Sequence, residues 1–284
     1  MGRIVIVHGI GQQFKGSHTL HEAFLPALRD GLDRVGVDFS KPEDLVCAFY
    51  GDLFRKKSTK SLMHPPYEAV DVSEGLEQDL LALWWQEAAQ SESQVPGPYS
   101  QTKSRAPNTI QRALNALSKS KFFTEVAERA MIGDLKQVRS YLEDQSVREQ
   151  IQERIVNVMQ SDSKVLIGHS LGSIVAYEAL CAHPEWSIQT FITLGSPLGI
   201  RNLIFDRLRP SPAEGMGIWP GNTQQWINIA DGGDIVALEK ELRSRFGNRV
   251  HDELIYNGAT AHDIRPYLTA QETGRAIAAA IGER

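Results

Sequence analysis

Short apolar runs alternate with longer amphipathic segments along much of the chain. The runs are rich in β-branched residues, which is typical of strands buried on both faces of a parallel sheet, and the segments between them have helical spacing. The predicted strands are residues 3–7, 45–50, 164–168, 190–194, 225–230 and 253–256. The predicted helices of this alternating part are residues 19–35, 173–182, 237–246 and 270–281, the last with Thr269 as a candidate cap.

The alternation is interrupted between Phe54 and Asp162, where no convincing strand pattern occurs. Helical spacing returns instead, and a stretch rich in Ser, Gln and Pro is typical of a loop. In this part the pattern predicts helices over 73–90, 108–117, 122–131 and 147–159, and a loop over 91–107. We therefore expect a single α/β domain over residues 1–284, with a helical insertion over residues 55–145 between the second and third core strands.

Composition narrows the class of protein. The chain has 284 residues, of which 42% are hydrophobic and 23% charged, as in an ordinary globular protein. These values exclude a collagen, a disordered tail and a disulfide scaffold. The formal net charge is −5, whereas a dedicated nucleic-acid binder usually carries a basic face. We expect no nucleic-acid partner.

Three further features of the sequence predict a cytoplasmic protein. No window of eighteen apolar residues occurs, so we expect no stable insertion into a membrane. The apolar run that follows Arg3 is too short for the core of a signal peptide. Cys47 and Cys181 stand far apart in apolar contexts, which predicts two buried, reduced thiols.

The strongest chemical signal is Gly168-His169-Ser170-Leu171-Gly172, a G-x-S-x-G motif. It follows the apolar residues 165–167 and opens a helical pattern, so it has the strand–turn–helix context that a nucleophilic serine needs. Small neighbours let the strand and the helix approach closely, and the turn raises the hydroxyl above the edge of the sheet. Ser170 is the candidate nucleophile.

A second motif, His8-Gly9-Ile10-Gly11, follows the first predicted strand. A serine that attacks an acyl group needs two N–H donors for the oxyanion that forms. One donor is expected from the residue after the nucleophile, Leu171, and the other from a loop after an early strand. The flanking glycines make Ile10 the candidate for the second donor. A phosphate-binding loop is disfavoured because the G-x-x-x-x-G-K-[ST] pattern is missing.

Together these motifs resemble the α/β-hydrolase superfamily, and within it the lipase-like and esterase-like members that begin at the strand carrying His-Gly. Gly195-Ser196-Pro197, after the strand over 190–194, is similar to the tripeptide found there in many bacterial lipases. The resemblance covers roughly residues 1–50 and 146–284 and leaves out the insertion. It implies an α/β-hydrolase fold, with a mostly parallel sheet flanked by helices and the insertion as a cap or lid.

The superfamily order is serine, then an acid after a later strand, then a histidine after the last strand. Asp234 lies in an Asp-x-Val sequence after the strand over 225–230 and matches the usual position of the acid, with Asp231 as the alternative. His262 follows the last predicted strand, where the base belongs. His251 precedes that strand and lies at its wrong end.

These elements predict a serine hydrolase that cleaves a carboxylic ester through a Ser-His-Asp triad and an acyl-enzyme intermediate, with a small-molecule or lipid ester as substrate. An acyltransferase, a thioesterase or a peptidase on the same fold is the alternative, as is a non-catalytic interaction protein. Trp84, Trp85, Phe122 and Phe123 either form the core of the insertion or line an acyl pocket. We expect no cofactor and no metal, because the spacing of the histidines fits no H-E-x-x-H motif.

Overall fold

The computed structural model describes residues 2–55, 67–98, 107–121, 123 and 128–282. In these residues six strands form one sheet in the order β2-β1-β3-β4-β5-β6, and all five pairings are parallel. The strands are Arg3–Val7 (β1), Leu45–Ala48 (β2), Ser163–His169 (β3), Thr190–Leu194 (β4), Gln225–Asp231 (β5) and Val250–Ile255 (β6). The predicted fold class, an α/β sheet flanked by helices, is confirmed.

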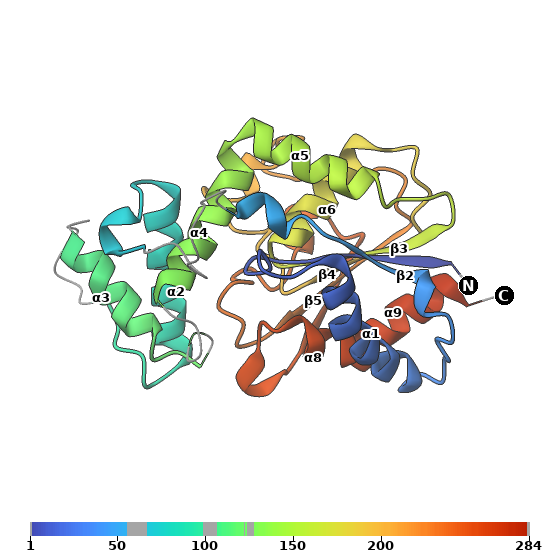
Figure 1. Ribbon diagram of the computed structural model, residues 1–284, viewed down its shortest axis with the longest axis horizontal. Coiled ribbons are helices and arrows are strands. Elements are labelled where there is room, and N and C mark those ends of the chain that lie inside the picture. The colour runs from blue at the N-terminus through green and yellow to red at the C-terminus, as the bar shows by residue number, and fades with distance from the viewer. Residues whose placement is uncertain (1, 56–66, 99–106, 122, 124–127, 283–284) are drawn as a thin grey trace.

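Helices cover both faces of the sheet (Figure 1). They are Ser17–Asp33 (α1), Leu76–Ser91 (α2), Pro107–Leu117 (α3), Glu128–Glu143 (α4), Gln145–Val156 (α5), Leu171–Ala182 (α6), Arg243–Phe246 (α7), Ile264–Thr269 (α8) and Gln271–Ile281 (α9). Helices α1, α8 and α9 pack on one face, and α5 and α6 pack on the other.

The alternation of side chains along β1 shows how the two faces divide the core. Val5 and Val7 join a hydrophobic cluster with α5 and α6, whereas Ile4 and Ile6 join a second cluster with α1, α8 and α9. All four side chains are fully buried. Successive residues of a strand point to opposite faces, so a run without polar positions requires cover on both sides.

Several boundaries differ from those predicted. Strand β6 begins at Val250, so His251 lies within the strand and not before it. The helix predicted over 237–246 is reduced to α7, because the Asp252 carboxylate accepts from the backbone N–H groups of Leu242 and Arg243. Part of the helix predicted over 122–131 lies outside the described residues, and α4 continues to Glu143.

The structure contains a further helix near the C-terminus. Helix α8 is short and was not predicted, and Asp263 caps it by accepting from the N–H of Arg265 at 2.9 Å. Thr269 is the last residue of α8, and its hydroxyl donates to the carbonyl of Arg265 at 2.9 Å. The expected cap of α9 is therefore wrong, and Ala270 occupies that position.

Helices α2, α3 and α4 lie between β2 and β3 in the chain and form a group to one side of the sheet (Figure 1). A buried carboxylate joins α2 to α4: Glu77 is 1% exposed and lies 3.3 Å from Lys136 Nζ and 3.4 Å from Arg139 Nη1. Two cations compensate its burial, since an unpaired buried charge would be costly. The apolar side chains of this group belong to the same hydrophobic cluster as α5 and α6.

Two further expectations concern membrane spans and the cysteines. No helix in the described part of the chain is both long and apolar enough to cross a membrane. Cys47 is buried as expected, but Cys181 is only partly buried, and both thiols are free.

Candidate active site

Ser170 occupies a sharp turn between β3 and α6. Its backbone has φ 52° and ψ −128°, a strained conformation for a residue with a side chain, and the residue is 2% exposed. A Cβ on Gly172 would lie 2.2 Å from the Val7 carbonyl oxygen, and one on Gly168 would lie 2.5 Å from Ser173 Cα. The glycines are thus required by the close approach of α6 to β1 and β3, as the motif predicted.

The loop after β1 contacts this turn directly. A Cβ on Gly9 would lie 2.8 Å from Ser170 Cβ, so the loop passes against the candidate nucleophile. Ile10 and Leu171, the two residues predicted to supply oxyanion donors, both line one cavity with Ser170. The sequence therefore brings both candidate donors next to the candidate nucleophile.

His8 fixes the start of that loop. Burial lowers the pKa of His8 to about 4, so the ring is neutral near pH 7. Its Nε2 accepts from the N–H of Tyr50 at 3.2 Å, which leaves Nδ1 protonated to donate to the Gly9 carbonyl at 2.7 Å. The rings of His8 and Tyr50 stack with centroids 4.0 Å apart. The loop is held from within the core.

Asp234 and His262 form a short pair. His262 Nδ1 donates to Asp234 Oδ2 at 2.7 Å, and Asp234 is fully buried. Burial by itself would raise the pKa of Asp234, but the adjoining His262 and the N–H of Val236, which donates to Oδ1 at 2.9 Å, lower it to about 2. A buried carboxylate that stays ionised can hold an imidazole in one orientation.

Asp231, the alternative acid, has a different environment. One of its oxygens accepts from the N–H of Gly233 at 2.7 Å, and the other accepts from the N–H of Asn257. The carboxylate thus joins the turn after β5 to the loop that carries His262. Of the two acids, Asp234 is the one whose carboxylate contacts the His262 ring.

The turn after β4 packs against the acid–histidine pair. Gly195 has φ 53°, and a Cβ there would lie 2.7 Å from Asp234 Oδ2 and 3.1 Å from His262 Nδ1. Only glycine fits this position. The next residue, Ser196, shares a hydrogen bond of 2.7 Å with Ser173 of α6. The Gly-Ser-Pro sequence therefore lies between the serine turn and the acid–histidine pair.

His169 connects Ser170 to the loop of His262. Burial, together with the charge of His262, lowers the pKa of His169 to about 3, so the ring is neutral. Its Nε2–H donates to the carbonyl of His262 at 2.8 Å, and the ring centroids of His169 and His262 lie 4.7 Å apart. The residue before the candidate nucleophile thus anchors the backbone of the candidate base.

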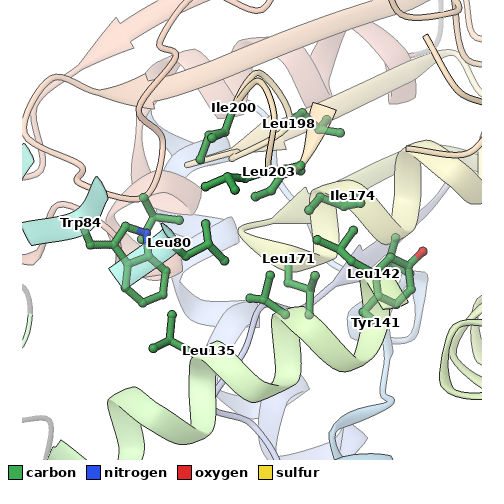
Figure 2. Packing of buried hydrophobic residues seen from close by; sticks show 14 of the residues in the cluster. Leu80, Trp84, Leu135, Tyr141, Leu142, Leu171, Ile174, Leu198, Ile200 and Leu203 are labelled. Atoms are coloured by element: carbon green, nitrogen blue, oxygen red, sulfur yellow. The ribbon is translucent and has the colours of Figure 1, made fainter. Parts of the chain in front are cut away.

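An apolar cavity opens beside Ser170. Besides Ser170, Ile10 and Leu171, its lining consists of Leu80, Trp84, Val138, Ile174, Pro197, Ile200, Ile204 and Val236. Figure 2 shows Leu80 and Trp84 of α2 in the same apolar cluster as Leu171 and Ile200. This cavity has room for about one water molecule. Trp84 therefore both packs inside the insertion and lines the cavity, while Phe122 lies outside the described residues.

Two residues near the site carried no signal in the sequence. Tyr267, on the unpredicted helix α8, donates its hydroxyl to Asp234 Oδ2 at 2.9 Å. Gln137, on α4, accepts from the N–H of Gly11 at 3.2 Å. No motif marks either residue, and only the packing of distant segments brings them to the site. Among the described residues no group of three or more His, Cys, Asp or Glu side chains could hold a metal ion.

Comparison with known proteins gives a similarity to a described family. Residues 91–214 match the family described as the PGAP1-like alpha/beta domain. The matched segment contains β3, the Ser170 turn, α6 and β4, begins inside the expected insertion and ends before Asp234 and His262. It therefore differs from the range of resemblance expected from the motifs, residues 1–50 and 146–284. No curated protein matches the chain. The match and the all-parallel sheet together confirm the resemblance to the α/β-hydrolase superfamily and assign the chain its α/β fold.

Proposed function

We propose that the protein is a serine hydrolase that cleaves a carboxylic ester. The observation that carries the proposal is the short bond between His262 Nδ1 and Asp234 Oδ2, 2.7 Å, in the loops that adjoin the strained turn of Ser170. A serine on such a turn and an imidazole held by a buried carboxylate are the parts that acyl transfer requires. The similarity to an α/β-hydrolase type of family supports the same chemistry.

In the first half of the proposed reaction, Ser170 Oγ attacks the ester carbonyl carbon while His262 Nε2 accepts the hydroxyl proton. The carbonyl oxygen becomes an oxyanion, and the backbone N–H groups of Ile10 and Leu171 stabilise its charge. The same proton is then given to the leaving alkoxide, so an alcohol departs and an acyl-enzyme remains. Asp234 stays ionised throughout and stabilises the imidazolium.

In the second half, water replaces the alcohol. His262 accepts a proton from the water as its oxygen attacks the acyl carbon, and returns that proton to Ser170 Oγ when the carboxylic acid leaves. The side chains that line the cavity beside Ser170 are mostly apolar, which supports an ester with an apolar acyl part, a small molecule or a lipid, and the cavity would have to widen to admit it. We further propose that residues 55–145 act as a cap over this cavity and that the enzyme works in the cytoplasm, where its two free thiols would stay reduced.

Labelling with a fluorophosphonate tests the proposal, because this probe reacts covalently with an activated serine. We expect wild type to be labelled at Ser170, and Ser170→Ala to lose labelling. Ser244→Ala, which removes an exposed serine on α7, is the matched control and should label like wild type. Equal labelling of wild type and Ser170→Ala would refute the proposal. A series of nitrophenyl esters of increasing acyl length would then define the acyl group.

A further inference from the structure

The Asp234 carboxylate has a second side-chain donor besides His262. Tyr267 is fully buried on α8, and its hydroxyl donates to Asp234 Oδ2 at 2.9 Å. The same hydroxyl oxygen accepts from the backbone N–H of Asp231 at 2.8 Å. One phenol thus bridges the backbone at the end of β5 and the oxygen that holds the histidine.

We propose that Tyr267 is a positioning residue of the active site, which acts on His262 through Asp234. The catalytic part of this inference rests on the proposed function. The structural part, that Tyr267 sets the orientation and charge of the carboxylate that holds His262, stands on the hydrogen bonds alone.

The direction of the bond follows from the two groups. The pKa of Asp234 lies at about 2, so its carboxylate is ionised and can only accept. Burial and the nearby Asp234 charge raise the pKa of Tyr267 well above its ordinary value, so the phenol keeps its proton. The tyrosine therefore donates to the carboxylate, and the Asp231 N–H donates to the tyrosine.

The four donors of Asp234 divide between its two oxygens. Oδ1 accepts from the N–H groups of Val236 at 2.9 Å and Ala237 at 3.3 Å, which belong to its own turn. Oδ2 accepts from His262 and Tyr267. With donors on both oxygens the carboxylate cannot rotate without losing bonds, and Oδ2 keeps facing the imidazole. Tyr267 also takes up part of the negative charge that would otherwise act on His262 alone.

A single short element delivers both donors of Oδ2. His262 directly precedes Asp263, the residue that caps α8, and Tyr267 follows within the helix. Helix α8 is itself held tightly, because a Cβ on Gly31 of α1 would lie 2.2 Å from the Leu268 carbonyl oxygen. The spacing of His262 and Tyr267 is thus fixed by a capped helix that packs on α1, and a shift of α8 would move both donors together.

Tyr177 provides a matched control. It is also fully buried, its hydroxyl donates to the carbonyl of Ile218 at 2.8 Å, and the same oxygen accepts from the N–H of Ile218 at 3.1 Å. Tyr177→Phe therefore removes one donor and one acceptor from the core, as Tyr267→Phe does, but leaves Asp234 untouched. Any effect that both variants share is structural.

The test compares the two variants by kinetics, pH profile and thermal unfolding. We expect both to lower Tm by about 2–4 °C, the effect of about 1 kcal/mol in a domain of this size. Only Tyr267→Phe should lower kcat, by about 10-fold with KM unchanged, the effect expected for losing a hydrogen bond to a charged group. Its acid limb of kcat/KM should also move to higher pH, because Asp234 then attracts protonated His262 more strongly. A Tyr267→Phe variant with the kcat and pH profile of Tyr177→Phe would overturn the proposal.

Proton NMR separates this inference from the proposed function, since it needs no substrate. The His262 Nδ1–H held by Asp234 should give a low-field resonance, assigned by its loss in His262→Gln. We expect this resonance to shift in Tyr267→Phe and to stay in place in Tyr177→Phe. An unchanged resonance in Tyr267→Phe would overturn the positioning role, whether or not wild type hydrolyses esters.

A measurement on wild type covers the case in which Tyr267→Phe does not fold. The Nδ1–H of His262 and the hydroxyl of Tyr267 both donate to Asp234 Oδ2, so their protons should show a nuclear Overhauser effect at low temperature. Detection of this cross peak supports the bridge. Its absence, with both resonances assigned, would overturn it.

Discussion

The parallel sheet and the helical insertion over residues 55–145 contribute to the Ser170 site in different ways. The strand ends and loops of the sheet supply polar groups that are fixed by hydrogen bonds within the core, such as His169 and Asp234. The described helices of the insertion supply apolar side chains to the cavity, Leu80 and Trp84 from α2 and Val138 from α4. If the proposed function holds, the sheet would determine the reaction, and the insertion would contribute three of the side chains that select the substrate.

The largest expected effect tests the polar part of this division, the assignment of the acid. Asp234→Asn should lower kcat/KM by about 10⁴-fold, because the amide favours the wrong histidine tautomer. Asp231→Asn is the matched control and should cost about 10-fold, since it weakens only hydrogen bonds to the N–H groups of Gly233 and Asn257. Steady-state kinetics on a nitrophenyl ester measure both. The reverse order of the two losses would make Asp231 the acid.

The two regions should also respond to pH in opposite directions. In the core the folded-state pKa values of His8 and His169, about 4 and about 3, lie below the ordinary 6.5. As the pH falls, the unfolded chain therefore binds protons at these histidines before the folded chain does. Their contribution to the free energy of unfolding is full above pH 6.5 and falls as the pH drops towards 3. In the insertion, burial raises the pKa of Asp134 from 3.8 to about 7. Here the folded chain holds the proton, so this contribution to the stability is full below pH 3.8, falls between pH 3.8 and 7, and is lost above pH 7.

Thermal unfolding between pH 4 and pH 8 measures both contributions. Asp134→Asn should remove the contribution that is lost between pH 3.8 and 7, an effect of up to a few kcal/mol, since each pKa unit corresponds to about 1.4 kcal/mol. The loss on the acid side should remain, because His8 and His169 are unchanged. Glu149→Gln, which changes an exposed residue of α5, is the control and should leave the profile unaltered. An unchanged profile between pH 4 and 7 in Asp134→Asn would remove this contrast between the regions.

A smaller effect tests the apolar part of the comparison. Trp84→Phe should enlarge the cavity beside Ser170 and raise the preference for longer acyl chains by about 10-fold in kcat/KM, the worth of one or two methylenes in an apolar pocket. Trp85→Phe is the matched control. Its indole N–H donates to the Pro96 carbonyl at 2.7 Å, and the residue is absent from the cavity lining. Equal chain-length profiles for both variants would show that α2 does not select the acyl group.

The sequence predicted the sheet well because its signals are local. Buried parallel strands are continuous β-branched runs, and each predicted run is found as a strand in the described residues. The Ser170 turn and the His-Gly loop were predictable for the same reason, since close backbone approach requires glycine at Gly9, Gly168 and Gly172. Proximity of Asp234 to His262 followed from the order of strands in the superfamily, not from spacing in the chain.

Other features were not predictable because distant packing decides them. Residues 237–242 have helical spacing, but the Asp252 carboxylate takes the N–H groups that would extend α7. Helix α8 is too short to show a period, so Tyr267 had no context from which its bond to Asp234 could be inferred. Gln137 lies far from Gly11 in the chain, and only the folded insertion brings them together.

The smallest expected effect concerns that last contact, where the two regions meet. Gln137 is 5% exposed, its Oε1 accepts from the N–H of Gly11, and its Nε2 donates to Gln13 Oε1 at 3.3 Å. Helix α4 thus holds the loop that carries Ile10, so the insertion also affects the proposed oxyanion donor. Gln137→Leu keeps the volume of the side chain but leaves the Gly11 N–H without its acceptor.

If that contact positions the loop, Gln137→Leu should lower kcat by about 3-fold to 10-fold with little change in KM, since a single hydrogen bond is worth about 1 kcal/mol. Gln150→Leu, on the exposed side of α5, is the control for the loss of an amide. A rise in KM alone would mean that Gln137 affects only substrate binding. The insertion would then have no part in positioning the reacting groups. A fall in kcat would mean that the insertion, through α4, also takes part in positioning the loop that carries Ile10. The two regions would then not have separate roles.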